Sequence, residues 1–247
     1  MKAIMLAAGR GSRLSGDDAY HPPKSMLKFG GMSLLERHIR VLREAGINGL
    51  TLVVGYRSGD LRAELKRIGA DDFVKTIDNQ DFYEGTGVSL WCAHDVLLSG
   101  ERVLFMDADV LYHPDLIARL VTSPSEDCLL LDQHFEPDDE PVRLCVKSGQ
   151  VVEFRKGADV DCDLVGEWPG FLTLEPQTAR AVCDSLERTI RAGNRDAPME
   201  EAIREVAMRA PAGTFWIEEI TGLPWIEIDF PEDLKRAETE ILPKLPW

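Results

Sequence analysis

Residues 2–14, KAIMLAAGRGSRL, run from a short apolar segment straight into a glycine-rich turn. Lys2–Ala7 has the length and apolar character of a buried strand. Because Gly9 and Gly11 can take backbone angles closed to other residues, the N–H groups after the strand can form a concave nest for an anion. Arg13 adds a cationic fork that suits a triphosphate. The segment therefore predicts a nucleotide-binding turn made of Leu6, Ala7, Ala8, Gly9, Gly11, Ser12 and Arg13.

This turn differs from two common phosphate-binding motifs. It has no GxxxxGK[ST] sequence, and Leu14 stands where the dinucleotide fingerprint has its third glycine. The glycines alone would fit an ordinary strand-to-loop turn. Ala7 and Ala8 before them and Arg13 after them favour a nucleotide.

A second segment, His21–Leu27 (HPPKSML), presents a lysine from a stiff backbone. Pro22 and Pro23 disfavour a helix, so we expect Lys24 to project from a rigid, extended arm. A lysine held near a phosphate nest can stabilise charge at a reacting phosphorus. We therefore predict Lys24 and Arg13 as the catalytic residues, because the two segments occur together rather than because of either one alone.

Length and composition fit one α/β domain. The chain has 247 residues, of which 44% are hydrophobic, and no apolar run approaches the length of a membrane span. It begins with a strand rather than a signal peptide, and its five scattered cysteines form no CxxC pair. We therefore expect reduced thiols and a cytoplasmic location.

The charge of the chain bears on its partners. A net charge of −15 argues against nucleic acid and anionic membranes. It does not argue against a nucleotide, because local cations and a divalent metal can neutralise the phosphates. The oligomeric state stays open, with a homodimer as one option.

Strand and helix patterns alternate in the first half of the chain. Apolar spacing predicts helices at Ser33–Ala45, Leu61–Ile68, Val88–Leu98 and His113–Val121. It predicts strands at Leu50–Val54, Phe73–Ile77, Arg102–Met106 and Cys128–Leu131. This order predicts a Rossmann-like, mostly parallel mixed sheet with helices on both faces.

The pattern changes after Leu131. Val142–Val146 and Val151–Phe154 flank Ser148-Gly149, which predicts a hairpin. Later elements are expected at Phe171–Leu174, Gln177–Arg191, Met199–Arg209, Thr214–Ile220 and Trp225–Ile228, with a last helix from Pro231. We expect a single domain over 1–247, with a nucleotide-binding half at about 1–131 and an acceptor-binding half at about 132–247.

Two predicted strands end in paired carboxylates. The first leads to Asp107 and Asp109, whose side chains are expected to share one face if the strand continues. The second carries Glu227 and Asp229 on one face. Ligands of open α/β sheets bind beyond the carboxyl ends of strands, and Mg²⁺ prefers one or two carboxylates with phosphate oxygens. One aspartate of the first pair could instead cap a helix, and Glu227 could equally lie on the strand surface.

The motifs LAAGRGSRL and PKSML resemble the nucleotidyltransferases that join a nucleoside triphosphate to a sugar phosphate or a small phospho-alcohol. Within them, the chain looks most like the cytidylyltransferases acting on phosphocholine, 2-aminoethylphosphonate or inositol phosphate. The resemblance runs through Asp229 and the helix after it, and implies a GT-A-like nucleotidyltransferase fold. It also implies that Asp109 and Asp229 bind Mg²⁺, with Asp107 as a supporting residue of the nucleotide site.

The segment 78–90 resembles the one that lies over the pyrimidine base in this family. Asn79 offers both a donor and an acceptor, as the edge of cytosine requires. Ser89 could do the same or cap its helix. Tyr83 of this segment is assigned to the acceptor. Many relatives carry an asparagine where Thr86-Gly87 stands, which leaves base choice and acceptor contacts less constrained.

The second half could hold a cage for a substrate ammonium group, because aromatic faces and carboxylates both attract cations. The alternative is that the tryptophans pack in the core and the acids face water. The tryptophans are Trp168, Trp216 and Trp225, and the acids are Asp159, Asp161, Asp163, Glu167, Glu200, Glu201, Glu218 and Glu219. Of these, the three tryptophans and Glu200 are assigned to the acceptor, and so is Glu227.

These features together predict a CTP- and Mg²⁺-dependent cytidylyltransferase. The acceptor's phosphate or phosphonate oxygen would attack the α-phosphorus and expel pyrophosphate, without need of a general base. Two alternatives stay open: a sugar-1-phosphate or inositol-phosphate nucleotidyltransferase, and a non-catalytic nucleotide-binding regulatory protein.

Overall fold

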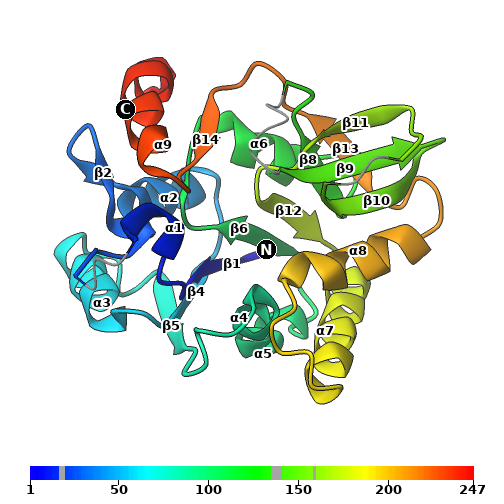
Figure 1. Ribbon diagram of the computed structural model, residues 1–247, viewed down its shortest axis with the longest axis horizontal. Coiled ribbons are helices and arrows are strands. Elements are labelled where there is room, and N and C mark those ends of the chain that lie inside the picture. Colours follow the sequence, from blue (N-terminus) through cyan, green and yellow to red (C-terminus); the bar gives the residue numbers. More distant parts are fainter. Residues whose placement is uncertain (17–19, 135–140, 158–159) are drawn as a thin grey trace.

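A seven-stranded sheet, in the order β13-β8-β12-β6-β1-β4-β5, forms the centre of the protein (Figure 1). The computed structural model describes residues 1–16, 20–134, 141–157 and 160–247. β12 runs antiparallel to β6 and β8, whereas the other neighbours in the sheet are parallel, so the predicted mostly parallel mixed sheet is confirmed. The strands are β1 (Lys2–Ala7), β4 (Leu50–Val54), β5 (Val74–Asp78), β6 (Val103–Asp107), β8 (Cys128–Leu131), β12 (Phe171–Leu174) and β13 (Trp216–Glu219).

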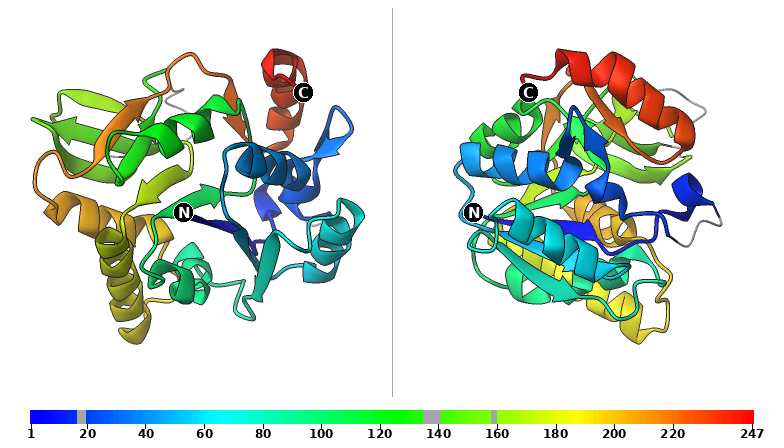
Figure 2. Two further views of the ribbon diagram at one scale, coloured as in Figure 1. Left: turned by 180° about the vertical axis from the view of Figure 1, so that it is seen from behind. Right: turned by 90° about the vertical axis from the view of Figure 1, so that its left-hand side faces the viewer.

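Helices cover both faces of the sheet, as predicted. Successive residues of β1 point to opposite faces, so Ala3 and Met5 enter one apolar layer and Ile4 enters the other. The first layer includes α2 (Leu34–Glu44), α3 (Ser58–Arg67) and α6 (Asp115–Thr122), and Figure 2 (left) shows α2 and α6 in front of the sheet. The second includes α4 (Thr86–Cys92), α5 (His94–Leu97), α7 (Pro176–Arg191) and α8 (Met199–Arg209).

The predicted continuous helix Val88–Leu98 is wrong, because the structure divides it into α4 and α5 at Ala93. His94 Nδ1 lies 3.0 Å from the carbonyl oxygen of Trp91, and the two rings stack with their centroids 5.1 Å apart. That side chain takes up a carbonyl that an uninterrupted helix would offer to the backbone. The break therefore arises from a local side-chain contact that apolar spacing does not reveal.

Smaller sheets complete the fold. The predicted hairpin is confirmed as β9 (Val142–Lys147) and β10 (Gln150–Lys156), joined through Ser148 and Gly149, which both have positive φ. β11 (Leu164–Glu167) pairs with β9 on its other side. The remaining elements are α1 (Ser12–Ser15), a 3-10 turn at Lys24–Met26, β2 (Lys28–Phe29), β3 (Met32–Ser33), β7 (Val110–Tyr112), β14 (Trp225–Glu227), α9 (Pro231–Arg236), a π turn at Ala237–Ile241 and a 3-10 turn at Leu242–Lys244.

A third apolar cluster includes Leu14 of α1, Leu34 at the start of α2, Leu111 of β7, Ile226 of β14 and Ile228 after β14. It ties the segment after β1 to β14 and α9, which lie near each other in Figure 1. In the part of the chain described here, no helix combines the length and apolar character needed to cross a bilayer.

Candidate active site

A cavity of about 500 Å³ lies where β1 and β6 end. Its described lining carries nine carboxylates and four cationic side chains. Most of the residues predicted for the site line it: Leu6, Ala7, Ala8, Gly9, Gly11, Ser12, Arg13, Lys24, Ser89, Asp107, Asp109, Trp168, Glu200, Trp225, Glu227 and Asp229. Asn79, Tyr83 and Trp216 are not among the lining residues.

The glycine-rich turn and the lysine arm pack against each other. Gly11 has φ +67°, and a Cβ there would lie 3.0 Å from Cγ of Lys24. Gly9 has no positive φ and open space around it, so the conformational argument holds for Gly11 and not for Gly9. Pro23 is extended, as expected, but Lys24 opens a 3-10 turn rather than continuing an extended arm.

A two-stranded ribbon brings Asp109 and Asp229 together across 120 residues of chain. β6 ends at Asp107, so Asp109 leaves the large sheet and precedes β7, which pairs antiparallel with β14. The Ile228 N–H donates to the Asp109 carbonyl at 2.9 Å. The expectation that Asp107 and Asp109 share one face of a continuing strand therefore does not apply, because the strand ends between them.

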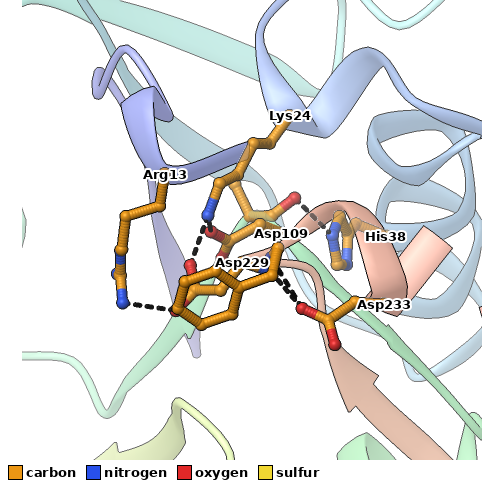
Figure 3. A network of polar contacts seen from close by, with 8 residues as sticks. Arg13, Lys24, His38, Asp109, Asp229 and Asp233 are labelled. Carbon is orange, nitrogen blue, oxygen red and sulfur yellow. Dashed lines mark hydrogen bonds and ion pairs between the residues drawn. The ribbon is translucent and has the colours of Figure 1, made fainter. Parts of the chain in front are cut away.

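Lys24 bridges the two aspartates (Figure 3). Its Nζ lies 2.8 Å from Asp109 Oδ2 and 2.6 Å from Asp229 Oδ1, and Arg13 approaches Asp229 Oδ2 at 2.8 Å. Burial lowers the pKa of Lys24, but the two carboxylates outweigh it and hold that pKa above its ordinary value. The guanidinium of Arg13 also lies over the ring of Phe230, 5.8 Å from its centroid.

Buried polar groups hold this centre in place. The Asp233 carboxylate accepts hydrogen bonds from the N–H groups of Asp229 (2.9 Å) and Phe230 (2.7 Å) at the start of α9. His38 lies 3.2 Å from the carbonyl oxygen of Ala108 and 3.2 Å from the Tyr112 hydroxyl, and burial lowers its pKa to about 4. These contacts orient the backbone on both sides of the aspartate pair (Figure 3).

Three carboxylates could share a metal ion. Ligand oxygens of Asp109, Glu227 and Asp229 all lie within 4.8 Å of one another. Glu227 is open to the cavity, but protein encloses its other sides. This burial, with the charges of Asp109 and Asp229, raises the pKa of Glu227 to about 8. An all-oxygen set that already attracts Lys24 fits Mg²⁺.

Asp107 lies next to the group formed by Asp109, Glu227 and Asp229. Gly170, with φ +90°, leaves room for it, because a Cβ there would lie 2.5 Å from Asp107 Oδ2. Burial and the charges of Asp109, Glu227 and Glu200 raise the pKa of Asp107 well above its ordinary value. The raised pKa favours the neutral form of Asp107 beside the three carboxylates, and its supporting role in the nucleotide site stays a prediction.

The predicted base-reading segment uses its polar groups internally. Asn79 is buried. Its side-chain NH₂ group donates to Ser89 Oγ at 3.0 Å, and its side-chain oxygen Oδ1 accepts from the Asp81 backbone N–H at 2.9 Å. Ser89 lines the cavity, whereas Tyr83 is 75% exposed and lies outside the lining. In this structure Asn79 positions Ser89. The side-chain donor and acceptor of Asn79, which were expected to bind cytosine, already form hydrogen bonds within the protein.

The three tryptophans do not form one cage. Trp168 lines the cavity but packs in the core beside Phe105 and Phe154, and its indole N–H donates to a carbonyl oxygen at 2.8 Å. Trp216 is 45% exposed on the edge strand β13. Trp225 lines the cavity and donates to Asp132 at 2.8 Å.

The acids predicted with the tryptophans also separate. Glu167, Glu200 and Glu227 line the cavity, and Asp161, Asp163, Glu201, Glu218 and Glu219 do not. Asp159 lies outside the described residues.

Two further lining residues were missed from the sequence. Lys156, at the end of β10, forms no ion pair with any residue that the structure describes. Ser25 is 3% exposed, and its hydroxyl has no hydrogen-bond partner among the described residues. Lys156 could have been found from the sequence as a basic residue just after a predicted strand in the acceptor half. Ser25 gave no sequence signal other than its position next to Lys24.

The chain is similar to known nucleotidyltransferases. Residues 3–155 match the MobA-like NTP transferase domain. A bifunctional IPC transferase and DIPP synthase of Rubrobacter xylanophilus is 28% identical over 97% of this chain and 52% of its own length. The chain thus spans about half the length of that relative.

Other relatives match almost end to end. The CTP:phosphoglutamine cytidylyltransferase of Campylobacter jejuni is 26% identical over 95% of this chain and 98% of its own. The choline-phosphate cytidylyltransferase of Streptococcus pneumoniae is 25% identical over 98% of both chains. Among solved structures, the inositol-1-phosphate CTP transferase from T. maritima superimposes with a TM-score of 0.77 at 19% identity, over 98% of this chain and 95% of that one.

Proposed function

The chain belongs to the MobA-like NTP transferase domain family, and from that premise we propose that it transfers CMP from CTP to a small phosphorylated or phosphonylated acceptor. It is a nucleotidyltransferase with cytidylyltransferase relatives. The observation that supports the proposal most is the meeting of Arg13 and Lys24 with Asp109 and Asp229 in one cavity.

Arg13 and Lys24 neutralise the triphosphate in this proposal. Both side chains line the cavity beside the turn that follows β1, so the phosphates of CTP can lie against this turn and these two cations. Lys24 then leaves the two carboxylates and balances the charge that grows at the α-phosphorus and on pyrophosphate. Its raised pKa keeps the ammonium charged throughout the neutral range.

Asp109 and Asp229, with Glu227 beside them, would hold Mg²⁺ through carboxylate oxygens. When bound there, Mg²⁺ supplies positive charge that polarises phosphate oxygens. The chain's own residues orient that site: Asp233 fixes the backbone at Asp229, and His38 fixes the carbonyl that precedes Asp109.

Residues 132–247 would supply the acceptor half of the cavity, and residues 1–131 the nucleotide half. Lys156 lies on the acceptor side without an ion pair among the described residues, so it can bind the acceptor's phosphate or phosphonate. That oxygen is already anionic near neutral pH. The chain therefore needs no general base, and its residues act by positioning and by charge neutralisation.

Relatives of several names leave a second acceptor class to test. The relative named as an IPC transferase aligns over 97% of this chain, so an inositol phosphate is the second candidate, together with sugar 1-phosphates. Membership of a nucleotidyltransferase family favours an enzyme over the non-catalytic binding protein that the sequence alone left open.

The test is pyrophosphate release by the purified chain with Mg²⁺, using CTP, UTP, dTTP, ATP and GTP against phosphocholine, 2-aminoethylphosphonate, inositol 1-phosphate and glucose 1-phosphate. We expect the highest kcat/KM with CTP and a phosphorylated or phosphonylated amine. Preference for another triphosphate, or no release with any pair, would contradict the proposal.

A further inference from the structure

The corner of the chain between β4 and α3 contacts both phosphate-binding segments. This corner is 55–57, and its residues are not among those that line the cavity. The Tyr56 N–H donates to the Ala8 carbonyl of the glycine-rich turn at 2.9 Å. The Tyr56 hydroxyl donates to the His21 carbonyl, at the start of the lysine arm, at 3.0 Å. One residue thus joins the turn after β1 to the segment that carries Lys24.

Arg57 holds the same arm a second time. Its guanidinium donates to the carbonyls of Tyr20 and His21, the latter at 3.3 Å, and to the Asp60 carboxylate in the first turn of α3. Arg57 has φ +48°, and Ser148 of the hairpin is the other non-glycine residue with a positive φ in the part of the chain that the structure describes. Such residues keep this costly conformation only where the surrounding contacts enforce it. The corner therefore keeps a strained backbone while it binds two carbonyls of the arm.

Close packing fixes the corner itself. A Cβ at Gly55 would lie 2.5 Å from Cβ of Phe82 and 2.9 Å from the Ala8 carbonyl oxygen. The ring of Tyr56 lies beside the ring of Phe82, with the two centroids 6.5 Å apart. Because this packing does not involve the hydroxyl group, Tyr56→Phe should remove the bond to the arm and leave the ring in place.

The stretch from His21 to Lys24 can transmit a shift of the arm. The rings of Pro22 and Pro23 fix two successive φ angles. Pro23 is buried, and its carbonyl accepts from the Met26 N–H at 2.8 Å. Few bonds in this stretch are free to rotate, so a displacement of the His21 carbonyl also displaces Lys24 and its ammonium group.

We infer that Tyr56 and Arg57 are positioning residues for Lys24, which hold the carbonyls of Tyr20 and His21 so that the ammonium group stays aligned for the transfer. The inference rests on the proposed function and deepens it, because it names what aligns the lysine that neutralises the reacting phosphates. Both residues act through Lys24 rather than on the substrate. Misplacing a catalytic group by about 1 Å can lower a rate about 100-fold, so such alignment is measurable.

A double-mutant cycle separates alignment of Lys24 from general support of the fold. Tyr56→Phe is made in the wild type and in Lys24→Met. For each protein, kcat and KM for CTP are measured by pyrophosphate release, with whichever of the four acceptors named above reacts fastest, and Mg²⁺ alone is titrated calorimetrically. Thr122→Val is the matched control, because Thr122 also donates from its hydroxyl to a backbone carbonyl, that of Ala118 at 2.8 Å, but lies outside the cavity lining.

We expect Tyr56→Phe to lower kcat of the wild type about 3- to 10-fold, as the loss of one neutral hydrogen bond does, with KM for CTP within about twofold. In Lys24→Met the same change should alter kcat less than about twofold, because the group that Tyr56 aligns is gone. A looser arm also holds the ammonium less firmly on Asp109 and Asp229. Mg²⁺ should therefore bind Tyr56→Phe about two- to fivefold more tightly than the wild type, with no such gain in Lys24→Met.

Arg57→Gln should show the same pattern, and it replaces Tyr56→Phe in the cycle if that variant does not unfold cooperatively. Thr122→Val should match the wild type in all quantities. An equal loss of kcat in both backgrounds would reduce the corner to a structural support. Unchanged kcat and Mg²⁺ affinity in Tyr56→Phe and Arg57→Gln would overturn the inference.

Failure of the proposed function has a different signature, because the wild type would then release no pyrophosphate from CTP with any acceptor tried. In that case the Mg²⁺ titrations decide the inference alone. A tighter affinity in Tyr56→Phe that disappears in Lys24→Met supports the alignment of Lys24, and equal affinities contradict it.

Discussion

Replacing Lys24 by methionine should lower turnover and, at the same time, tighten Mg²⁺ binding. Nζ of Lys24 lies 2.8 Å from an oxygen of Asp109 and 2.6 Å from an oxygen of Asp229. Methionine keeps most of the length of the side chain but removes its charge. The two carboxylates then lose their bridging cation, repel each other and attract a divalent ion more strongly.

The loss of stability expected for Lys24→Met follows from the partial burial of Lys24, Asp109 and Asp229. Two unit charges about 4 Å apart attract by about 4 kcal/mol at an effective dielectric constant near 20, before desolvation is counted. The side chains are 12% (Lys24), 23% (Asp109) and 14% (Asp229) exposed. Breaking a fully buried pair costs about 3–5 kcal/mol, and Arg13 still pairs with Asp229, so we expect about 2–3 kcal/mol. For a chain of this length, the melting temperature should fall by about 4–12 °C without Mg²⁺.

Three measurements test this prediction: thermal unfolding with and without Mg²⁺, calorimetric titration of Mg²⁺, and kcat at saturating CTP. In Lys24→Met, Mg²⁺ should restore most of the lost melting temperature and bind about tenfold more tightly or better, whereas kcat should fall about 100-fold or more. Lys75→Met is the control, because Lys75 is exposed on β5 and lies outside the cavity, so all three quantities should match the wild type.

The reasoning would be refuted by a Lys24→Met protein that binds Mg²⁺ no more tightly than the wild type. In that case Lys24 would not compete for the carboxylates. Near-normal kcat with only a raised KM for CTP would remove Lys24 from the reaction itself and leave it a role in nucleotide binding.

Three further predictions concern the support of the site. Asp109→Asn and Asp229→Asn should each abolish Mg²⁺-dependent turnover while unfolding stays cooperative; an active variant at saturating Mg²⁺ would exclude that residue as a ligand. Because the pKa of buried His38 is lowered to about 4, the unfolded chain takes up a proton there before the folded one as pH falls below about 6.5. Urea unfolding should therefore show up to about 3 kcal/mol less stability at pH 4 than at pH 7 from this group, a loss absent in His38→Gln. Gly170→Ala should cost about 2–4 kcal/mol by chemical denaturation, because of its φ of +90° and the 2.5 Å approach to Asp107. Gly193→Ala, with φ +86° and open space, should cost about 1–2 kcal/mol, and equal costs for the two would remove the contact from the explanation.

Much of the fold could be predicted because its signals are local. Cys128–Leu131 and Met199–Arg209 were predicted with the bounds that the structure shows, since each is a short stretch with clear apolar spacing. The hairpin at Ser148-Gly149 follows from turn chemistry. The break at Ala93 was missed because it depends on the contact of His94 with the Trp91 carbonyl, which spacing does not encode.

The candidate site, like the fold, could be predicted only in its local parts. The sequence by itself determined that a strand ends in a glycine-rich turn with Arg13, that prolines precede Lys24, and that other strands lead to Asp109 and Asp229. Glycine, proline and alternating apolar residues act on the nearest few bonds, so these local arrangements can be derived without the rest of the chain.

Only the tertiary structure decided which of these side chains meet. The pairing of β7 with β14 brings Asp109 to Asp229 and both to Lys24, and the anchoring of α8 against α4 brings Glu200 to the cavity. The same packing hydrogen-bonds the side-chain amide of Asn79 to Ser89 and leaves Trp216 outside the cavity. Such outcomes depend on contacts between segments far apart in the chain, whose free energies come from burial and pairing that no single segment contains.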